Sequence, residues 1–135
     1  FLKDNRVIEG DVEEHLDVYF RHCAIKLNCD LLARMGRVLA NDGVDPTNGV
    51  RIVESRHVQI AKTFMVTCGM YNASGEFAIK VGIPAKSGVS GAILALVPGK
   101  AGIGVIGPAL DVKGNSIAGV RLLRRLSQQY QLNIF

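Results

Sequence analysis

The segment best suited to chemistry is KSGVSG at residues 86–91, directly before a long apolar run. Glycines beside a Lys-Ser pair let the backbone come close to a ligand, because no Cβ atom stands in the way. The lysine adds positive charge at the same place. The segment could therefore bind a ligand through backbone amides, although an ordinary glycine-rich entrance to a strand is the alternative and is favoured for so short a motif.

A second glycine pattern, GIGVIG at residues 102–107, matches the G-x-G-x-x-G fingerprint of dinucleotide-binding proteins. That fingerprint must follow a strand, open a helix and precede an acidic residue about 20 positions later. Here Pro108 follows at once, and no acidic residue comes after Asp111. We therefore predict no nucleotide site and no cofactor.

The histidines and cysteines do not have the spacing of metal ligands. No Cys-x-x-Cys pair is present, and two histidines on one helix face would make a poor metal site. We predict no metal, solvent-facing histidines, and buried reduced thiols in a cytoplasmic protein. These residues are His15, His22, His57, Cys23, Cys29 and Cys68.

Length and charge narrow the class of protein. The 135 residues, 48% hydrophobic and 21% charged, suit one domain and exclude a disordered chain. The longest uncharged stretches have about 13 residues, too few for a membrane span of roughly 20. The one tight basic cluster, Arg121, Arg124 and Arg125, stands near the end of a predicted helix, where cations are favoured. We predict no membrane and no nucleic-acid partner.

The first half of the chain has helical periodicity. Apolar residues at steps of three and four predict helices over Asp11–Leu27 and Asn28–Ala40, and a third capped by Ser55 and reaching Cys68. The residues expected on their buried sides are Val12, Leu16, Tyr19, Phe20, Cys23, Ala24, Leu27, Leu31, Leu32, Met35, Val38, Leu39, Val58, Ala61, Phe64, Met65 and Cys68.

The second half is rich in glycine and predicts strands. Gly91–Val97 is apolar throughout, as in a strand buried on both faces, and Ile103–Ile106 must pair with it antiparallel because the link is short. Phe77–Val81 is expected as a third strand. A final helix should run from Asn115 or Ser116 to about Tyr130, with Ile117, Val120, Leu123, Leu126 and Tyr130 inward.

The prediction is thus a single α+β region: helices over about 1–72, antiparallel strands over about 77–107, and a helix over about 115–131. One C-terminal helix cannot cover both faces of an apolar strand. We therefore expect partner elements from outside the chain, or an intermolecular sheet.

Longer motifs point to a family. A Lys-[Ser/Thr]-Gly box at a strand edge is found in serine acyl-transfer enzymes such as β-lactamases. Here it occurs within IPAKSGVSG at 83–91, after CGMY at 68–71 and SGEFA at 74–78, and before GNS at 114–116. Together with Tyr-Phe-x-x-Cys at 19–23, the series resembles the C-terminal half of serine-dependent glutaminases. The resemblance implies a partial β-lactamase/DD-peptidase-like fold.

The same resemblance implies an enzyme that hydrolyses L-glutamine to L-glutamate and ammonia through a serine acyl-enzyme, as a homo-oligomer. By motif, Tyr19 would contact the substrate, and Tyr71 would contact it and act as acid/base partner. Val89 would offer its amide to the oxyanion, and Lys86 would support Tyr71 by its charge.

The family's Ser-x-x-Lys nucleophile segment is not in the chain, since no serine has a lysine three residues later. We therefore expect the nucleophile in an N-terminal half upstream of these residues, and no activity from the chain alone. The alternatives are a β-lactam-interacting or peptidase-like acyl hydrolase and a non-catalytic binding module.

Overall fold

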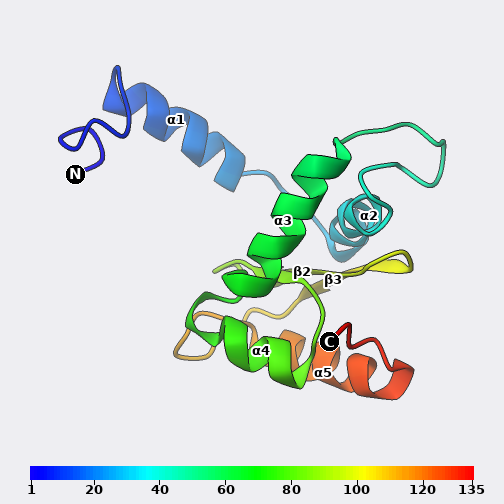
Figure 1. Cartoon of the computed structure of the whole chain (residues 1–135). Coiled ribbons are helices and arrows are strands. Elements are labelled where there is room, and N and C mark those ends of the chain that lie inside the picture. Colours follow the sequence, from blue (N-terminus) through cyan, green and yellow to red (C-terminus); the bar gives the residue numbers. More distant parts are fainter.

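An antiparallel sheet of three strands forms the centre of the structure, a computed structural model that describes residues 1–135 (Figure 1). The strands are β1 (Ala85–Ser87), β2 (Ala92–Val97) and β3 (Ala101–Ile106), in the order β1-β2-β3. Ala95 of β2 lies opposite Ala85 on one side and Ile103 on the other. The predicted β2–β3 hairpin is confirmed.

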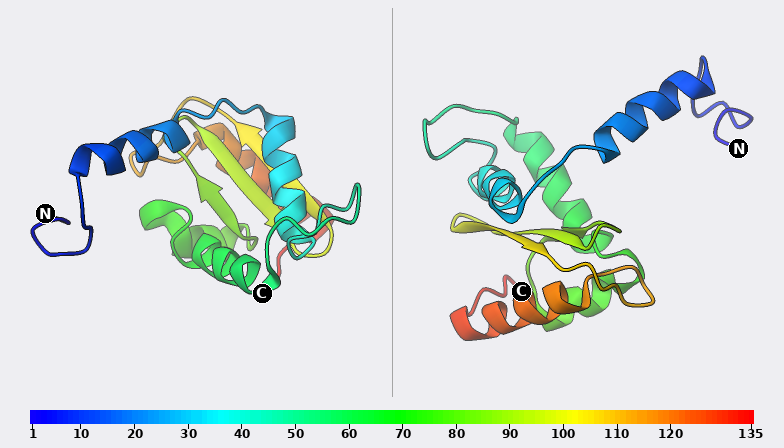
Figure 2. Two further views of the ribbon diagram at one scale, coloured as in Figure 1. Left: turned by 90° about the horizontal axis from the view of Figure 1, so that it is seen from above. Right: turned by 180° about the vertical axis from the view of Figure 1, so that it is seen from behind.

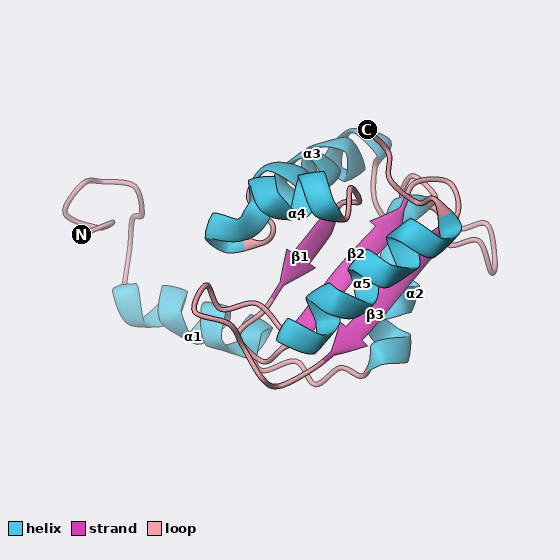
Figure 3. Cartoon of the chain, turned by 90° about the horizontal axis from the view of Figure 1, so that it is seen from below, coloured by secondary structure: helices cyan, strands magenta, loops and turns pink.

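Helices cover both faces of this sheet. Helices α2 (Cys29–Ala40) and α3 (Ser55–Thr67) lie on one side, and α4 (Ser74–Lys80) and α5 (Ile117–Tyr130) on the other (Figure 1). Figure 3 shows α5 running along β2 and β3, with α4 beside β1.

Side chains of β2 alternate between the two layers, as the pleat of a strand requires. Ile93, Ala95 and Val97 belong to the core with Leu123 of α5, whereas Leu96 packs with Ala40 and Met65 of α2 and α3. Helix α2 supplies the second layer, so this layer does not require the elements expected from outside the chain. The strands β1 and β3 remain at the edges of the sheet.

The GIGVIG segment has a packing role. Residues 102–106 lie in β3 and open no helix, so the structure agrees with the prediction against a nucleotide fingerprint. A Cβ atom on Gly102 would lie 2.1 Å from the Ala33 carbonyl oxygen, and one on Gly104 would lie 2.2 Å from that of Cys29. Only glycine fits at these two positions, because the backbone of α2 packs directly against the backbone of β3.

Helix α1 (Val12–Cys23) projects away from the rest of the molecule (Figures 1 and 2). None of its residues is buried, so the predicted apolar stripe exists but has no core to face. The helix also ends four residues earlier than predicted. The spacing of its apolar residues gives the helix an apolar face, and this spacing does not show whether the surface that covers the face lies in the same chain.

The expected strand over Phe77–Val81 is wrong, because these residues belong to α4 and its end. Ser74, Phe77 and Val81 are buried at spacings of three and four, which is the helical period. The ion pair between Lys80 and Glu76, four residues apart, supports the same helix. A short apolar run does not distinguish a strand from a buried helical turn.

Helix ends were easier to predict than helix faces. Asn28 and Ser116 cap α2 and α5 with their side chains, whereas α3 is preceded by Glu54, not Ser55, as its cap. Several helical residues that were expected in the core are exposed, because the sheet contacts only a narrow stripe of each helix. These residues are Leu31, Met35, Phe64, Ile117 and Tyr130.

The three cysteines are free but exposed, which corrects the prediction of buried thiols. Cys23 ends the projecting α1, Cys29 begins α2, and Cys68 caps the end of α3, so none points into the core. The histidines face solvent, as predicted. None of the helices is long and apolar enough to cross a lipid bilayer.

Candidate functional site

Tyr71 stands in a strained turn between α3 and α4. It begins a short 3₁₀ helix, η1 (Tyr71–Ala73), and has a φ of 51°, in the left-handed region that costs a residue other than glycine free energy. Gly69, two residues earlier, lets β1 approach, because a Cβ atom there would lie 1.9 Å from the Ala85 carbonyl oxygen. The amide of Ser87 then donates to the Gly69 carbonyl at 3.0 Å.

This approach brings Lys86 to Tyr71. The Lys86 ammonium lies 4.7 Å from the centre of the Tyr71 ring, and Lys86 also donates to the Ser87 carbonyl oxygen. A cation over an aromatic face is an attractive arrangement. The loop at Gly114 lies against the same ring, since a Cβ atom there would be 3.6 Å from Tyr71 Cε2. Two of the predicted site residues are therefore in contact.

Val89 lies in the turn that leaves β1. Its side chain is 77% exposed, and its N–H donates no hydrogen bond within the chain. The turn is closed on both sides of it, by the Gly88 amide on the Ala92 carbonyl and by the Gly91 amide on the Gly88 carbonyl, each at 2.9 Å. A free backbone donor held in a fixed turn is the kind of group that can bind a developing negative charge.

Tyr19 lies on α1, with 62% of its surface exposed. A side-chain hydrogen bond with Cys23 is the main cause that raises the pKa of Tyr19 above its usual value, and the charge of Tyr71 raises it further. Helix α1 buries none of its residues, so Tyr19 is not packed against the turn that carries Tyr71.

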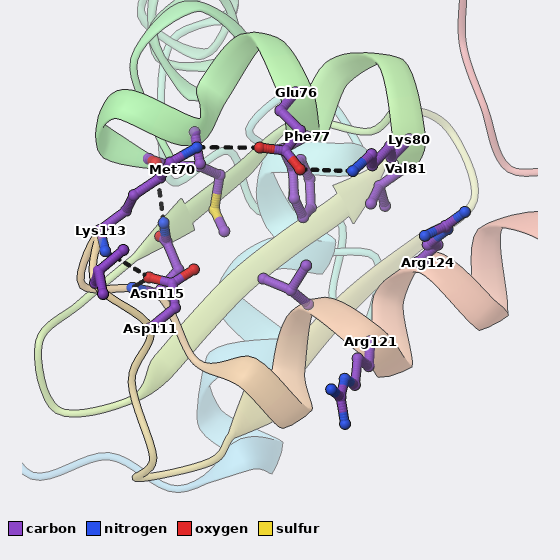
Figure 4. A pocket seen from close by; sticks show the side chains of 13 residues that line it. Met70, Glu76, Phe77, Lys80, Val81, Asp111, Lys113, Asn115, Arg121 and Arg124 are labelled. Atoms are coloured by element: carbon purple, nitrogen blue, oxygen red, sulfur yellow. Dashed lines mark hydrogen bonds and ion pairs between the residues drawn. The ribbon is translucent and has the colours of Figure 1, made fainter.

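Sequence reasoning missed a buried polar network behind Tyr71. The Ser87 hydroxyl donates to Asn115 Oδ1 at 2.6 Å. Asn115 Nδ2 donates to the Met70 carbonyl at 3.2 Å (Figure 4). The Asn115 amide also donates to Asp111 Oδ1 at 3.0 Å. The sequence predicts Asn115 or Ser116 as the start of the last helix, and Ser116 is its cap. In the sequence, the only sign of a buried polar site here is the pair Asn115-Ser116 directly before an apolar helix.

A cavity of about 200 Å³ lies on the α5 side of this network, between α4, α5 and the loop 111–115 (Figure 4). Glu76 stands at its edge and pairs with Lys80 at 2.6 Å and Lys113 at 3.0 Å. Hydrogen bonds from Lys80 and Lys113, with their charges, lower the pKa of Glu76 to about 2. The pairing links α4 to the loop that carries Asn115.

The Glu76 pairing predicts a pH-dependent stability. Its folded pKa lies below the usual 4.5, so the stabilisation is complete above pH 4.5 and is lost as the pH falls toward about 2. We expect Glu76→Gln to lower the urea midpoint at pH 7 and to lose this disadvantage near pH 2. The measurement is the difference in midpoint from the parent protein across that range.

Glu14→Gln is the matched control, because Glu14 is exposed on a helix and forms no ion pair. Its difference from the parent should stay small at every pH. A difference for Glu76→Gln that does not change between pH 7 and pH 2 would contradict the lowered pKa.

Comparison with known proteins gives the family. The sequence profile described as Glutaminase matches residues 1–135, the whole of the chain. The chain belongs to the glutaminase family. Its resemblance to these enzymes, read from CGMY and KSGVSG, is thus confirmed. The chain is 62% identical to the glutaminase of Alkaliphilus oremlandii over 135 residues. The alignment covers 100% of this chain and 44% of that protein. The chain therefore spans less than half the length of such glutaminases.

Solved glutaminases have the same fold. A crystal structure of the Bacillus subtilis glutaminase YbgJ, in covalent complex with 5-oxo-L-norleucine, matches with a TM-score of 0.97 and 45% identity over 99% of this chain and 48% of that one. The structure of Mglu in its glutamate form matches with a TM-score of 0.95 and 40% identity, over 99% of this chain and 31% of that one. The predicted β-lactamase-like α+β class is confirmed, and this chain corresponds to part of each of these two solved chains.

Proposed function

We propose that the protein carrying this chain hydrolyses L-glutamine to L-glutamate and ammonia, and that residues 1–135 form one wall of its active site. The observation that carries the proposal is the contact between Lys86 and Tyr71, with the free amide of Val89 on the turn that follows Lys86 in the sequence, in a chain of the glutaminase family. Acyl transfer needs an activated hydroxyl, a proton shuttle and donors for the oxyanion. The chain offers the second and the third.

In this proposal Tyr71 transfers the proton between the nucleophile and the leaving ammonia. The Lys86 ammonium, 4.7 Å from the centre of its ring, places positive charge beside the group that transfers the proton. The amide of Val89 would bind the oxyanion of the tetrahedral intermediate, so its side chain is not decisive. Tyr19 would contact the amino-acid part of glutamine from α1.

The nucleophile lies outside residues 1–135 in this proposal. None of the serines has a lysine three residues later, and the chain matches only 44% of the length of its A. oremlandii relative. We propose a Ser-x-x-Lys segment N-terminal to these residues in the same domain. Support for covalent chemistry comes from YbgJ, which forms a covalent complex by reaction with 6-diazo-5-oxo-L-norleucine.

We further propose a cytoplasmic homo-oligomer that needs no cofactor. Free cysteines suit a reducing compartment, and homo-oligomers are what the family resemblance implies. A β-lactam-interacting or peptidase-like hydrolase and a non-catalytic module are the competing functions.

The test is ammonia and glutamate release by the whole protein, with asparagine and a chromogenic cephalosporin as competing substrates. We expect turnover of glutamine and no opening of the β-lactam ring. The 135-residue chain alone, with its helix content checked by circular dichroism, should give no turnover. Activity from that chain would contradict the proposal that the nucleophile lies outside residues 1–135. Turnover of the β-lactam without turnover of glutamine would favour a β-lactam-interacting or peptidase-like hydrolase.

A further inference from the structure

The turn that carries Tyr71 is held from several sides at once. The Met70 amide donates to the Ser74 hydroxyl at 3.0 Å, and that hydroxyl donates to the Tyr71 carbonyl at 2.8 Å. The Met70 carbonyl accepts from the amide of Ala73 and from Asn115 Nδ2. A positive φ at a residue with a side chain persists only where its surroundings fix it.

Asn115 is the only one of these groups that joins the turn to the strand bearing Lys86 through a side chain. Its Oδ1 accepts from Ser87 Oγ, and its Nδ2 donates to the carbonyl of the residue before Tyr71. Asn115 is 1% exposed and Ser87 3% exposed, so both side chains of this network are buried. One planar amide therefore bridges the residue after Lys86 and the residue before Tyr71, in addition to the backbone bond from Ser87 to Gly69.

The loop that presents Asn115 is itself fixed. Asp111 Oδ1 accepts from the amides of Lys113 and Asn115, at 2.9 and 3.0 Å, and Lys113 pairs with Glu76 on α4 (Figure 4). The amide of Asn115 thus has little freedom to follow a displaced partner. Loss of the Asn115 side chain would leave the Tyr71 turn joined to β1 by the bond from the Ser87 amide to the Gly69 carbonyl alone, and a shift of the turn relative to Lys86 is expected.

We infer that Asn115 is a positioning residue for Tyr71, acting with Ser87 to hold the phenol beside Lys86. The inference rests on the proposed function, in which Tyr71 transfers the proton. A proton-transfer group displaced by about 1 Å can lose about a hundredfold in rate, although it is still present. Binding of substrate groups elsewhere would change little.

The test compares kcat and KM for glutamine in the whole protein, per folded molecule. We expect Asn115→Ala to lower kcat by about 10- to 100-fold with a much smaller change in KM. Ser87→Ala, which leaves the bond to Met70, should lose less, about three- to tenfold. The double variant should be no slower than Asn115→Ala, because both changes remove the same bond between the two side chains.

Ser127→Ala is the matched control. Ser127 is also a buried polar residue, 4% exposed, and its hydroxyl donates to the Val81 carbonyl, away from the Tyr71 turn. It should lower the unfolding midpoint and leave kcat per folded molecule unchanged. A merely structural role for Asn115 would give the same result as Ser127→Ala, and this outcome would overturn the inference. If Asn115→Ala does not fold, Ser87→Ala against Ser127→Ala decides in the same way.

Tyr71→Phe separates this inference from the proposed function. If Tyr71→Phe turns over glutamine normally, the proton-transfer role of Tyr71 fails, and the inference fails with it. If Tyr71→Phe is slow while Asn115→Ala and Ser87→Ala keep the parent kcat, only the positioning role of Asn115 is overturned.

Discussion

Tyr71→Phe in the whole protein is expected to lower kcat for glutamine by about 10²- to 10⁴-fold, the usual range for the loss of an acid/base group. The substitution removes one oxygen and keeps the ring that Lys86 contacts at 4.7 Å. The hydrogen bonds that hold the turn use the Ser74 hydroxyl, the Asn115 amide group and backbone atoms but not the Tyr71 hydroxyl, so the fold should be unaffected. The measurement is steady-state ammonia release at saturating glutamine.

Tyr130→Phe controls for the loss of a phenol as such. Tyr130 ends α5, is 60% exposed and makes no hydrogen bond through its side chain, so its removal should leave kcat unchanged. Normal turnover by Tyr71→Phe would contradict the acid/base role of Tyr71 and would favour a non-catalytic role for this turn.

Gly102→Ala is expected to destabilise the fold by about 3 kcal/mol or more, at the upper end of single substitutions. The added methyl group would lie 2.1 Å from the Ala33 carbonyl oxygen and 2.2 Å from the Arg37 nitrogen, both in the backbone of α2. Backbone atoms cannot move aside as a flexible side chain can, so the helix must separate from the sheet. Urea unfolding followed by circular dichroism measures the loss.

Gly75→Ala makes the same chemical change where there is space. Gly75 lies in α4, and a Cβ atom there would meet nothing within 4 Å. Alanine favours a helix over glycine by roughly 0.5–1 kcal/mol, so this variant should be slightly more stable than the parent. Equal stabilities for the two variants would contradict direct contact between the backbones of α2 and β3.

The elements that local sequence determines were predictable. The β2–β3 hairpin follows from two apolar runs joined by a short turn, and α5 from a capping serine and a helical stripe. Helix α4 was mistaken for a strand because its apolar residues are few, and the burial of Phe77 and Val81 depends on α5, far along the chain. The layer formed by α2 was also missed, because glycines in β3 carry no hydrophobic signal.

The site was predictable only where motifs carry it. CGMY and KSGVSG led to Tyr71 and Lys86, and the structure places these two in contact. Asn115 was not predicted to have a site role, since its partners Ser87 and Met70 are 28 and 45 residues away in sequence. No local spacing reports a hydrogen bond between residues so far apart.

The exposure of α1 has a consequence for affinity. In the proposed function Tyr19 contacts the substrate from a helix that buries none of its residues. If the helix held Tyr19 in the binding position only a tenth of the time, the apparent dissociation constant would be about tenfold weaker than the intrinsic one. In that proposal, a surface that packs against α1 would tighten substrate binding without contacting the substrate.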